Sequence, residues 1–111
     1  MTKSDFHDDA SFRSQAEAYF SHLLEQLDEI EFDEFDPRHT PGSLTLQFDD
    51  GSVVMLSRQT PTHELWLSAN YTAWHFLRED GIWKERDTQE AMLEVLNHIL
   101  SEKMNEKIEL V

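Results

Sequence analysis

The chain has 111 residues, which is enough for one domain with its own core and too few for two. Seven Phe, three Trp and two Tyr within an apolar fraction of 39% indicate a packed interior rather than a disordered chain. Twenty-three acidic and nine basic residues give a formal charge of −14, which argues against nucleic acid or membrane partners and favours cations or basic protein surfaces.

No cysteine is present, so neither disulfides nor thiolate metal sites can form. The polar, acidic start of the chain does not resemble a signal peptide, and no eighteen apolar residues follow one another. We therefore expect a cytoplasmic protein that does not span a membrane.

The first predicted element is a helix over about residues 11–29, preceded by a flexible N-terminal segment, residues 1–10. Asp9 or Ser11 can serve as its N-cap. Apolar residues recur at three- and four-residue steps and form one stripe: Phe12, Ala16, Tyr19, Phe20, Leu23, Leu27 and Ile30. The opposite face carries His22, Glu25, Asp28 and Glu29.

Beyond Ile30 the helical period is lost, and a first strand is predicted over about residues 31–36, ended by Pro37. The clearest strand signal follows, because residues 43–48 and 52–58 alternate around Asp49-Asp50-Gly51, the pattern of a hairpin. Further short strands are predicted at 64–69, 74–78 and 82–85.

A second helix is predicted over about residues 88–104, with Asp87 as N-cap and Glu90 at the third helical position. Residues 107–111 should form an extended tail laid against the fold. Helices that occur only at the two ends of a sheet most simply share one of its faces. The predicted fold class is therefore α+β, a two-layer α-β sandwich in which two terminal helices pack on one face of a five- to six-stranded antiparallel sheet. Residues 11–111 form its single domain.

The most unusual stretch is residues 25–36, where seven of twelve positions are carboxylates and none is lysine or arginine. A solvated helix face is the commoner explanation of such charge. However, like charges at helical spacing each cost about 0.2–0.5 kcal/mol, and a helix C-terminus prefers cations. The alternative is a shallow, weak site for a hard cation, with an EF-hand loop rejected on spacing. Its candidate ligands are Glu25, Asp28, Glu29, Glu31, Asp33 and His22.

No nucleophile, phosphate-loop or metalloprotease motif is present, so the sequence predicts no enzyme.

Among the tryptophans, Trp66 lies between Leu65 and Leu67, and two inward leucines would turn its ring to the open face of the sheet. There, beside Arg58 or Gln59, it would suit a protein-binding surface, although burial in the core is equally compatible with the sequence.

Several motifs taken in order resemble the frataxin family, most closely its bacterial CyaY type. The resemblance extends from about Phe12 to the end of the chain. It is most specific in Arg58-Gln59-Thr60-Pro61, with Trp66-Leu67 shortly after. The other matching segments are the acidic first helix, Gly42-Ser-Leu-Thr-Leu46, Asp50-Gly51-Ser52, Glu64-Leu-Trp-Leu67 and Trp74-His-Phe76.

This resemblance implies the same sandwich fold, and a protein of iron-sulfur cluster assembly that binds Fe²⁺ or Fe³⁺ weakly and modulates the complex of cysteine desulfurase and scaffold protein. It also implies a monomer in the absence of iron. Carried over by position, the iron-binding ridge is Glu25, Asp28, Glu29, Glu31 and Asp33, with Glu34 and Asp36 beside it as partner-binding residues. The partner-facing sheet surface maps onto Arg58, Gln59 and Trp66.

The chain departs from the family pattern at Ser57, where asparagine is common, at Glu64, where glutamine is common, and at Trp74, where bacterial relatives tend to have tyrosine. Three hypotheses follow: an iron-dependent regulator, an acidic inhibitor or adaptor without a physiological metal, and a catalyst of Fe²⁺ oxidation as proposed within the family. We expect the first, a binding module and not an enzyme.

Overall fold

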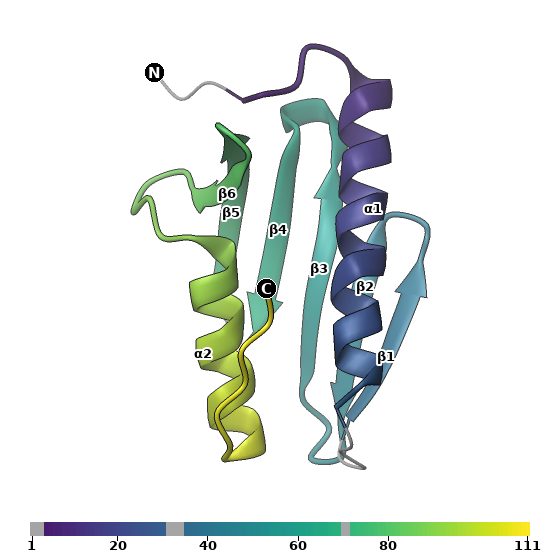
Figure 1. The fold of residues 1–111 in the computed structure, drawn as a ribbon, viewed down its shortest axis with the longest axis vertical. Helices are drawn as coiled ribbons and strands as arrows, with labels where there is room; N and C mark the ends of the chain where they lie inside the picture. Colours follow the sequence, from purple (N-terminus) through teal and green to yellow (C-terminus); the bar gives the residue numbers. More distant parts are fainter. Residues whose placement is uncertain (1–3, 31–34, 70–71) are drawn as a thin grey trace.

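The computed structural model describes residues 4–30, 35–69 and 72–111, in which two helices cover one face of a six-stranded sheet (Figure 1). Helix α1 spans Asp9–Asp28 and helix α2 spans Met92–Met104. Neither is both long and apolar enough to cross a membrane. The strands are β1 (Phe35–Thr40), β2 (Ser43–Phe48), β3 (Val53–Gln59), β4 (Glu64–Ala69), β5 (Thr72–Glu79) and β6 (Ile82–Glu85), with a short 3-10 turn, η1 (Thr60–Thr62).

The sheet is a simple antiparallel meander in which each strand pairs with its neighbours in sequence. The predicted hairpin is confirmed as β2 and β3, with Leu44 opposite Leu56 and Leu46 opposite Val54. Gly51, at the turn, has φ 88°, a left-handed conformation that glycine adopts without a steric penalty. The alternating sequence and the turn residues therefore determine the register of the sheet centre.

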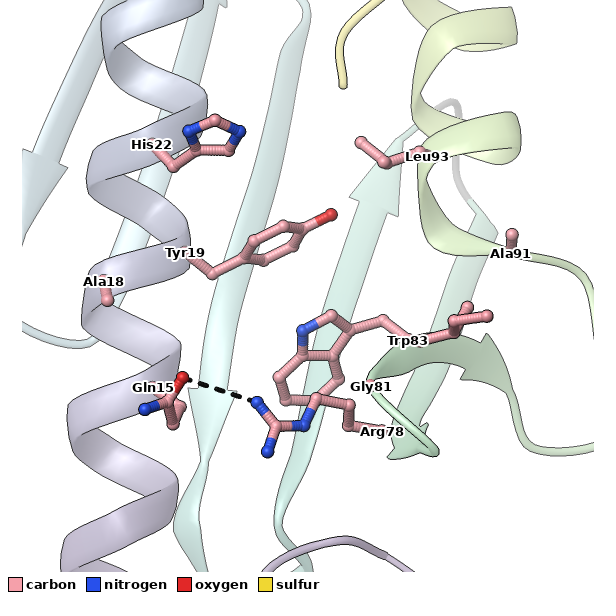
Figure 2. Close-up of a pocket in the computed structure, with 10 residues that line it drawn as sticks. Gln15, Ala18, Tyr19, His22, Arg78, Gly81, Trp83, Ala91 and Leu93 are labelled. Carbon is pink, nitrogen blue, oxygen red and sulfur yellow. Dashed lines mark hydrogen bonds between the residues drawn. The ribbon is translucent and has the colours of Figure 1, made fainter.

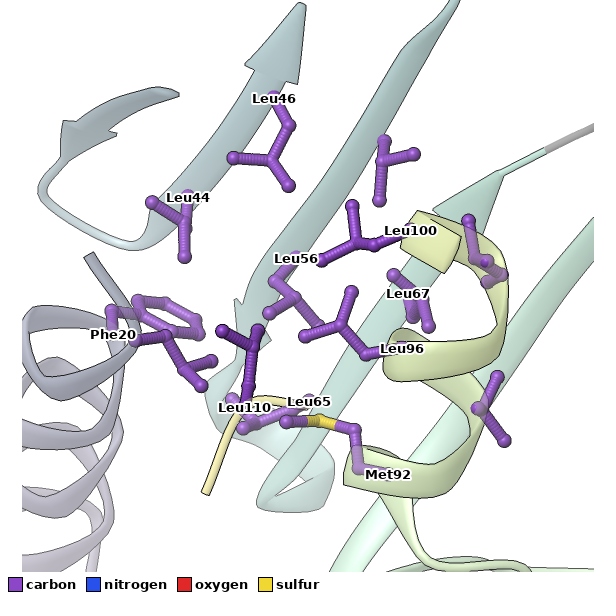
Figure 3. Packing of buried hydrophobic residues seen from close by; sticks show 14 of the residues in the cluster. Phe20, Leu44, Leu46, Leu56, Leu65, Leu67, Met92, Leu96, Leu100 and Leu110 are labelled. Atoms are coloured by element: carbon purple, nitrogen blue, oxygen red, sulfur yellow. The ribbon is translucent and has the colours of Figure 1, made fainter. Parts of the chain in front are cut away.

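The core lies between the sheet and the helices (Figure 3). From α1 it receives Phe12, Ala16, Phe20, Leu23 and Leu27, which confirms the predicted stripe, with Tyr19 and Ile30 half-buried at its border. The sheet supplies its alternate residues: Leu44, Leu46, Phe48, Val54, Leu56, Leu65, Leu67, Ala69 and Phe76. Their neighbours therefore face away from both helices, and the predicted α-β sandwich is confirmed.

The expected end of the first strand at Pro37 is wrong, because β1 continues through this residue to Thr40. Pro37 lies opposite Leu46 of β2, and β1 pairs with no other strand. An edge strand tolerates proline because the missing N–H is not needed by a second neighbour. Residues 31–34, the start of the predicted strand, lie outside the described residues.

The expected cap of the second helix is also wrong, since α2 begins at Met92 and Ala91 occupies the N-cap position without a side-chain bond. The carboxylate of Glu85 instead accepts hydrogen bonds from the backbone N–H groups of His75 (2.9 Å) and Asp87 (2.7 Å). Burial raises the pKa of Glu85, but these backbone bonds outweigh it and leave the pKa below its usual value. The acid that organises this turn therefore precedes it, and residues 87–90 stay outside the helix.

Residues 5–8 of the N-terminal segment contact the fold: Phe6 is buried in the core, and Asp8 caps α1 by accepting a 2.7 Å hydrogen bond from the backbone N–H of Ser11. Arg78 lies over the Phe6 ring at 4.2 Å from its centroid. The backbone N–H of Asp5 donates to the carbonyl of Arg78 at 2.8 Å. These contacts dock residues 5–8 on the fold, and the expectation of a flexible segment over residues 1–10 stays a prediction.

The tail is extended and lies in the space between the two helices (Figure 1), as expected. Ile108 and Leu110 are buried. Two side-chain amides bind its backbone reciprocally: Asn97 of α2 accepts from the N–H of Leu110 at 2.8 Å, and Gln26 of α1 accepts from that of Val111 at 2.8 Å. The tail therefore links α1 to α2 through hydrogen bonds to both helices.

Asp5 provides a test of the N-terminal docking, because its carboxylate accepts hydrogen bonds of 2.9 Å each from the Asp80 N–H, the Gly81 N–H and the Arg78 Nε. Asp5→Asn should lower the free energy of unfolding at neutral pH by about 1–2 kcal/mol. The hydrogen bond from Gly81 is the largest influence that lowers the pKa of Asp5.

Because the folded-state pKa lies below the ordinary value of 3.8, the stabilisation is present above that value and is lost as the pH falls through the folded-state pKa. Urea unfolding curves of the wild type and Asp5→Asn should therefore differ at pH 7 and converge in acid. Asp49→Asn, at an exposed turn, is the control and should unfold like the wild type. A difference that persists undiminished in acid would contradict the assignment.

Candidate functional site

The C-terminal end of α1 presents three exposed carboxylates, Glu25, Asp28 and Glu29. The last turn contains no basic residue, although the partial negative charge of a helix C-terminus favours one. Within the described part of the chain, none of the three forms an ion pair. This end of the helix is therefore a concentrated and uncompensated negative surface.

The structure brings the predicted metal ligands only partly together. Glu31 and Asp33, like the predicted partner residue Glu34, lie outside the described residues. Across residues 4–30, 35–69 and 72–111, no group of three His, Asp or Glu side chains converges on one point that could hold a metal ion. Asp36, at the start of β1, forms an exposed 2.9 Å ion pair with Arg38. The assignment of these ligands stays a prediction.

His22 lies on α1, but its ring is turned toward the tail. Its Nε2 lies 2.7 Å from the main-chain oxygen of Val111. Nε2 can approach that oxygen closely only as an N–H donor. His22 therefore joins α1 to the tail, and the structure assigns it no contact with the acids of the helix end.

Trp66 faces the open side of the sheet, where the alternation of Leu65 and Leu67 places it. Its ring is half-buried against His75, with the two ring centroids 4.5 Å apart, and its indole N–H donates to Glu64 at 3.1 Å. Ser57 lies opposite Trp66 on β3 and accepts a 3.2 Å hydrogen bond from the Gln59 amide. We call these five residues, Ser57, Gln59, Glu64, Trp66 and His75, the Trp66 cluster.

Arg58 does not join this cluster, contrary to one expectation. It alternates with Ser57 and Gln59 along β3, so its side chain points to the helix layer. There its Nη1 donates to Glu17 of α1 at 2.8 Å. Glu17 also accepts from the N–H of Gly42 at 2.7 Å and lies 2.8 Å from the His39 ring. Arg58 therefore holds α1 to the β1–β2 end of the sheet.

Glu64 is, with Ser57, a residue of the Trp66 cluster at which the sequence departs from the resemblance to the family. Its side chain is only 3% exposed although it carries a carboxylate. Besides the Trp66 N–H, its partner is Arg86, whose Nη1 lies 3.4 Å away and whose side chain is 44% exposed. Sequence reasoning missed both His75 and Arg86. Register could have revealed His75, which pairs with Trp66 across β4 and β5, but nothing local marks Arg86.

Trp74, the third departure, faces the helix layer and packs half-buried against the core. It lies opposite Leu67, on the covered face of the sheet. The open face therefore retains one tryptophan, Trp66, among the described residues.

The fold and its two polar surfaces define the class: an α+β sandwich with an uncompensated acidic helix end and an open sheet face centred on one tryptophan. The sequence matches the frataxin-like domain over residues 5–106. The chain belongs to the frataxin family.

Individual relatives agree with this assignment. The iron-sulfur cluster assembly protein CyaY of Neisseria meningitidis serogroup C is 33% identical over 102 residues, 92% of this chain and 94% of the relative. The protein of the same name from Pseudomonas entomophila is 33% identical over 111 residues, 98% of this chain and 94% of the relative.

Two solved structures share the fold. A frataxin from Psychromonas ingrahamii superposes with a TM-score of 0.87 at 22% identity, covering 95% of this chain and 99% of the other. Trimeric frataxin from Saccharomyces cerevisiae, complexed with ferrous iron, superposes with a TM-score of 0.72 at 19% identity, covering 96% and 94%.

The contact between Glu64 and Arg86 generates a prediction about the Trp66 cluster. Arg86→Gln should destabilise the fold by about 1 kcal/mol, because it leaves a buried carboxylate without its cationic partner. Adding Glu64→Gln should restore most of that loss, since a neutral amide oxygen still accepts from the Trp66 N–H. Denaturant unfolding of the two single variants and the double variant measures the coupling.

Arg38→Gln is the matched control, because its ion pair with Asp36 is exposed and should contribute little. If the effects of Arg86→Gln and Glu64→Gln were simply additive, the two side chains would not be coupled and the assignment would be wrong.

Proposed function

We propose that this protein binds iron weakly at the acidic end of α1 and acts in cytoplasmic iron-sulfur cluster assembly as a modulator of the cysteine desulfurase and scaffold complex. The single observation that supports this most is the set of exposed carboxylates, Glu25, Asp28 and Glu29, at a helix end that contains no basic residue. Relatives that cover nearly the whole chain carry the name iron-sulfur cluster assembly protein.

Carboxylate oxygens are hard ligands and suit iron in either oxidation state, whereas a cysteine-free chain offers no soft ligand. Exposed carboxylates keep most of their hydration, so each contributes little to affinity. A cation shared by several of them also relieves their mutual repulsion. We therefore propose a hydrated, weak site whose ligands include Glu31 and Asp33.

The same negative surface suits a basic patch on a protein partner, because opposite potentials raise the association rate and select the docking orientation. The Trp66 cluster is a second contact surface, since a half-buried aromatic ring with polar neighbours is typical of binding hot spots. Iron bound at the helix end would neutralise charge that the partner recognises. In this proposal the protein is a regulator and not an enzyme.

An adaptor that uses the same acids without a physiological metal is the second candidate. One observation favours it: Glu25, Asp28 and Glu29 are exposed and form no ion pair with a described residue, so basic side chains of a partner can meet them directly. Both candidates require the carboxylates for the desulfurase, and only the first requires them for iron.

A charge-reversal experiment separates the two. We compare the wild type with the triple variant Glu25→Lys, Asp28→Lys and Glu29→Lys in anaerobic Fe²⁺ titrations at physiological salt and in binding to the desulfurase. The control variant, Asp87→Lys, Glu90→Lys and Glu94→Lys, has the same total charge but changes exposed acids before and within the first turn of α2. Both affinities should fall at least about tenfold in the first variant and little in the control.

Loss of desulfurase binding without any Fe²⁺ binding by the wild type would favour the adaptor. Unchanged affinity for both ligands in the first variant, or equal losses in the two variants, would contradict the proposed function.

A further inference from the structure

A pocket of about 380 Å³ opens on the helix side of the molecule, away from the acidic helix end and from the Trp66 cluster. It lies between α1, the β5–β6 hairpin and the start of α2, as Figure 2 shows. Its volume falls within the range of small-molecule sites, roughly 300–1,000 Å³. Its lining is mostly apolar, with polar groups from only a few side chains.

The floor of the pocket is Trp83, which is 6% exposed. Its ring packs against Phe6, Phe12 and Tyr19, but no described residue accepts a hydrogen bond from its Nε1–H. Every fully enclosed side-chain nitrogen or oxygen among the described residues does have a partner. The unpaired Nε1–H must therefore open to the pocket, and Figure 2 shows it turned toward α1 across that space. Because Nε1 is not fully enclosed, water can reach it, and a ligand oxygen that replaces this water would accept its hydrogen bond within a largely apolar space.

Tyr19 provides a second donor from the wall of the pocket. Its ring is stacked on that of Trp83, with the centroids 6.2 Å apart and the planes 24° from parallel. Its hydroxyl likewise forms no hydrogen bond with a described residue. Burial raises the pKa of Tyr19 to about 12, so the hydroxyl keeps its proton at neutral pH and can donate.

The charges around the pocket differ from those of the protein as a whole. No aspartate or glutamate among the described residues lines it, although the chain has a formal charge of −14. Arg78 lies at the rim, with its Nε bound to Asp5 at 2.9 Å and its Nη1 at 3.4 Å from the Gln15 amide oxygen. That longer contact leaves guanidinium N–H groups available. Donors therefore outnumber acceptors around an apolar space with flat aromatic walls.

From this arrangement we propose that the pocket binds a small planar aromatic compound that carries a carboxylate or carbonyl oxygen. The aromatic body packs beside the rings of Tyr19 and Trp83, and the oxygen accepts from Trp83 Nε1–H or from Tyr19 Oη–H, which Figure 2 shows turned toward Leu93. Arg78 favours a carboxylate over a neutral carbonyl. This site shares no residue with the three described acids of the helix end or with the Trp66 cluster, whereas His22, one of the predicted iron ligands, lies in its wall.

Three probes with the same ring system test the proposal: 2-naphthoate, 2-naphthamide and 2-naphthylmethylamine. Each is titrated into ¹⁵N-labelled full-length protein and followed through the three tryptophan indole N–H signals, with Trp83 assigned by its loss in Trp83→Phe. The acid and the amide should shift the Trp83 signal saturably and leave that of Trp66 in place. The amine, which has no acceptor oxygen, should not shift it. No saturable shift with the acid or the amide, or equal shifts with all three probes, would overturn the proposal.

Substitutions locate the site without depending on Trp83. Ala18 is exposed on α1 and lines the pocket, so Ala18→Trp should fill the space and weaken 2-naphthoate binding at least about tenfold without harming the core. Ala10→Trp, also exposed on α1 but outside the pocket, is the matched control and should bind like the wild type. Tyr19→Phe, which removes only the hydroxyl, should weaken binding severalfold. Binding that survives Ala18→Trp unchanged would place the ligand elsewhere and contradict the assignment.

Discussion

Strict alternation along the central strands is the constraint on which the rest of this structure depends. Leu65 and Leu67 of β4 point to the helices, so Trp66 between them must point away. Full burial of each leucine contributes about 2 kcal/mol, and a slip of one residue would exchange the two faces of the whole strand. The hydrophobic pattern therefore determines at once where the core forms and which side chains remain for partners.

Because the core uses only one sheet face and one stripe of each helix, polar surfaces can be specialised without weakening it. The acids at the end of α1 lie opposite its buried stripe, so their mutual repulsion destabilises the helix end and leaves the core packing unaffected. A buried polar residue occurs on the open face, where Glu64 bonds both Trp66 and Arg86. The tail lies in the space between the helices. Hydrogen bonds between its last residue, Val111, and the side chains of Gln26 and His22 hold α1 in place.

Periodicity in the sequence was sufficient to predict the two helices and the hairpin, because these follow from local spacing and turn residues. It left Trp66 equally compatible with the core and with the open face, and the family resemblance favoured the open face that the structure shows. The errors occurred where long-range contacts decide. Pro37 does not end β1 because that strand lies at an edge. Asp87 does not cap α2 because the Glu85 carboxylate binds the backbone of this turn. Arg58 was assigned to the partner surface by resemblance, whereas its ion pair with Glu17, 41 residues away in sequence, holds it on the other face. The same limit hid the docking of Phe6 and the pocket around Trp83, since neither has a sequence motif.

In the proposed function, iron and the protein partner both bind at the end of α1, and only the protein partner contacts the open sheet face. The most direct test is NMR mapping of anaerobic Fe²⁺, and then of the cysteine desulfurase, on the same ¹⁵N-labelled sample. Iron should broaden signals of Glu25, Asp28 and Glu29 and spare Gln59 and Trp66, whereas the desulfurase should perturb the acidic helix end and reduce the effect of iron there. Iron broadening centred on the open sheet face, or spread evenly over the exposed acids of both helices, would contradict the account.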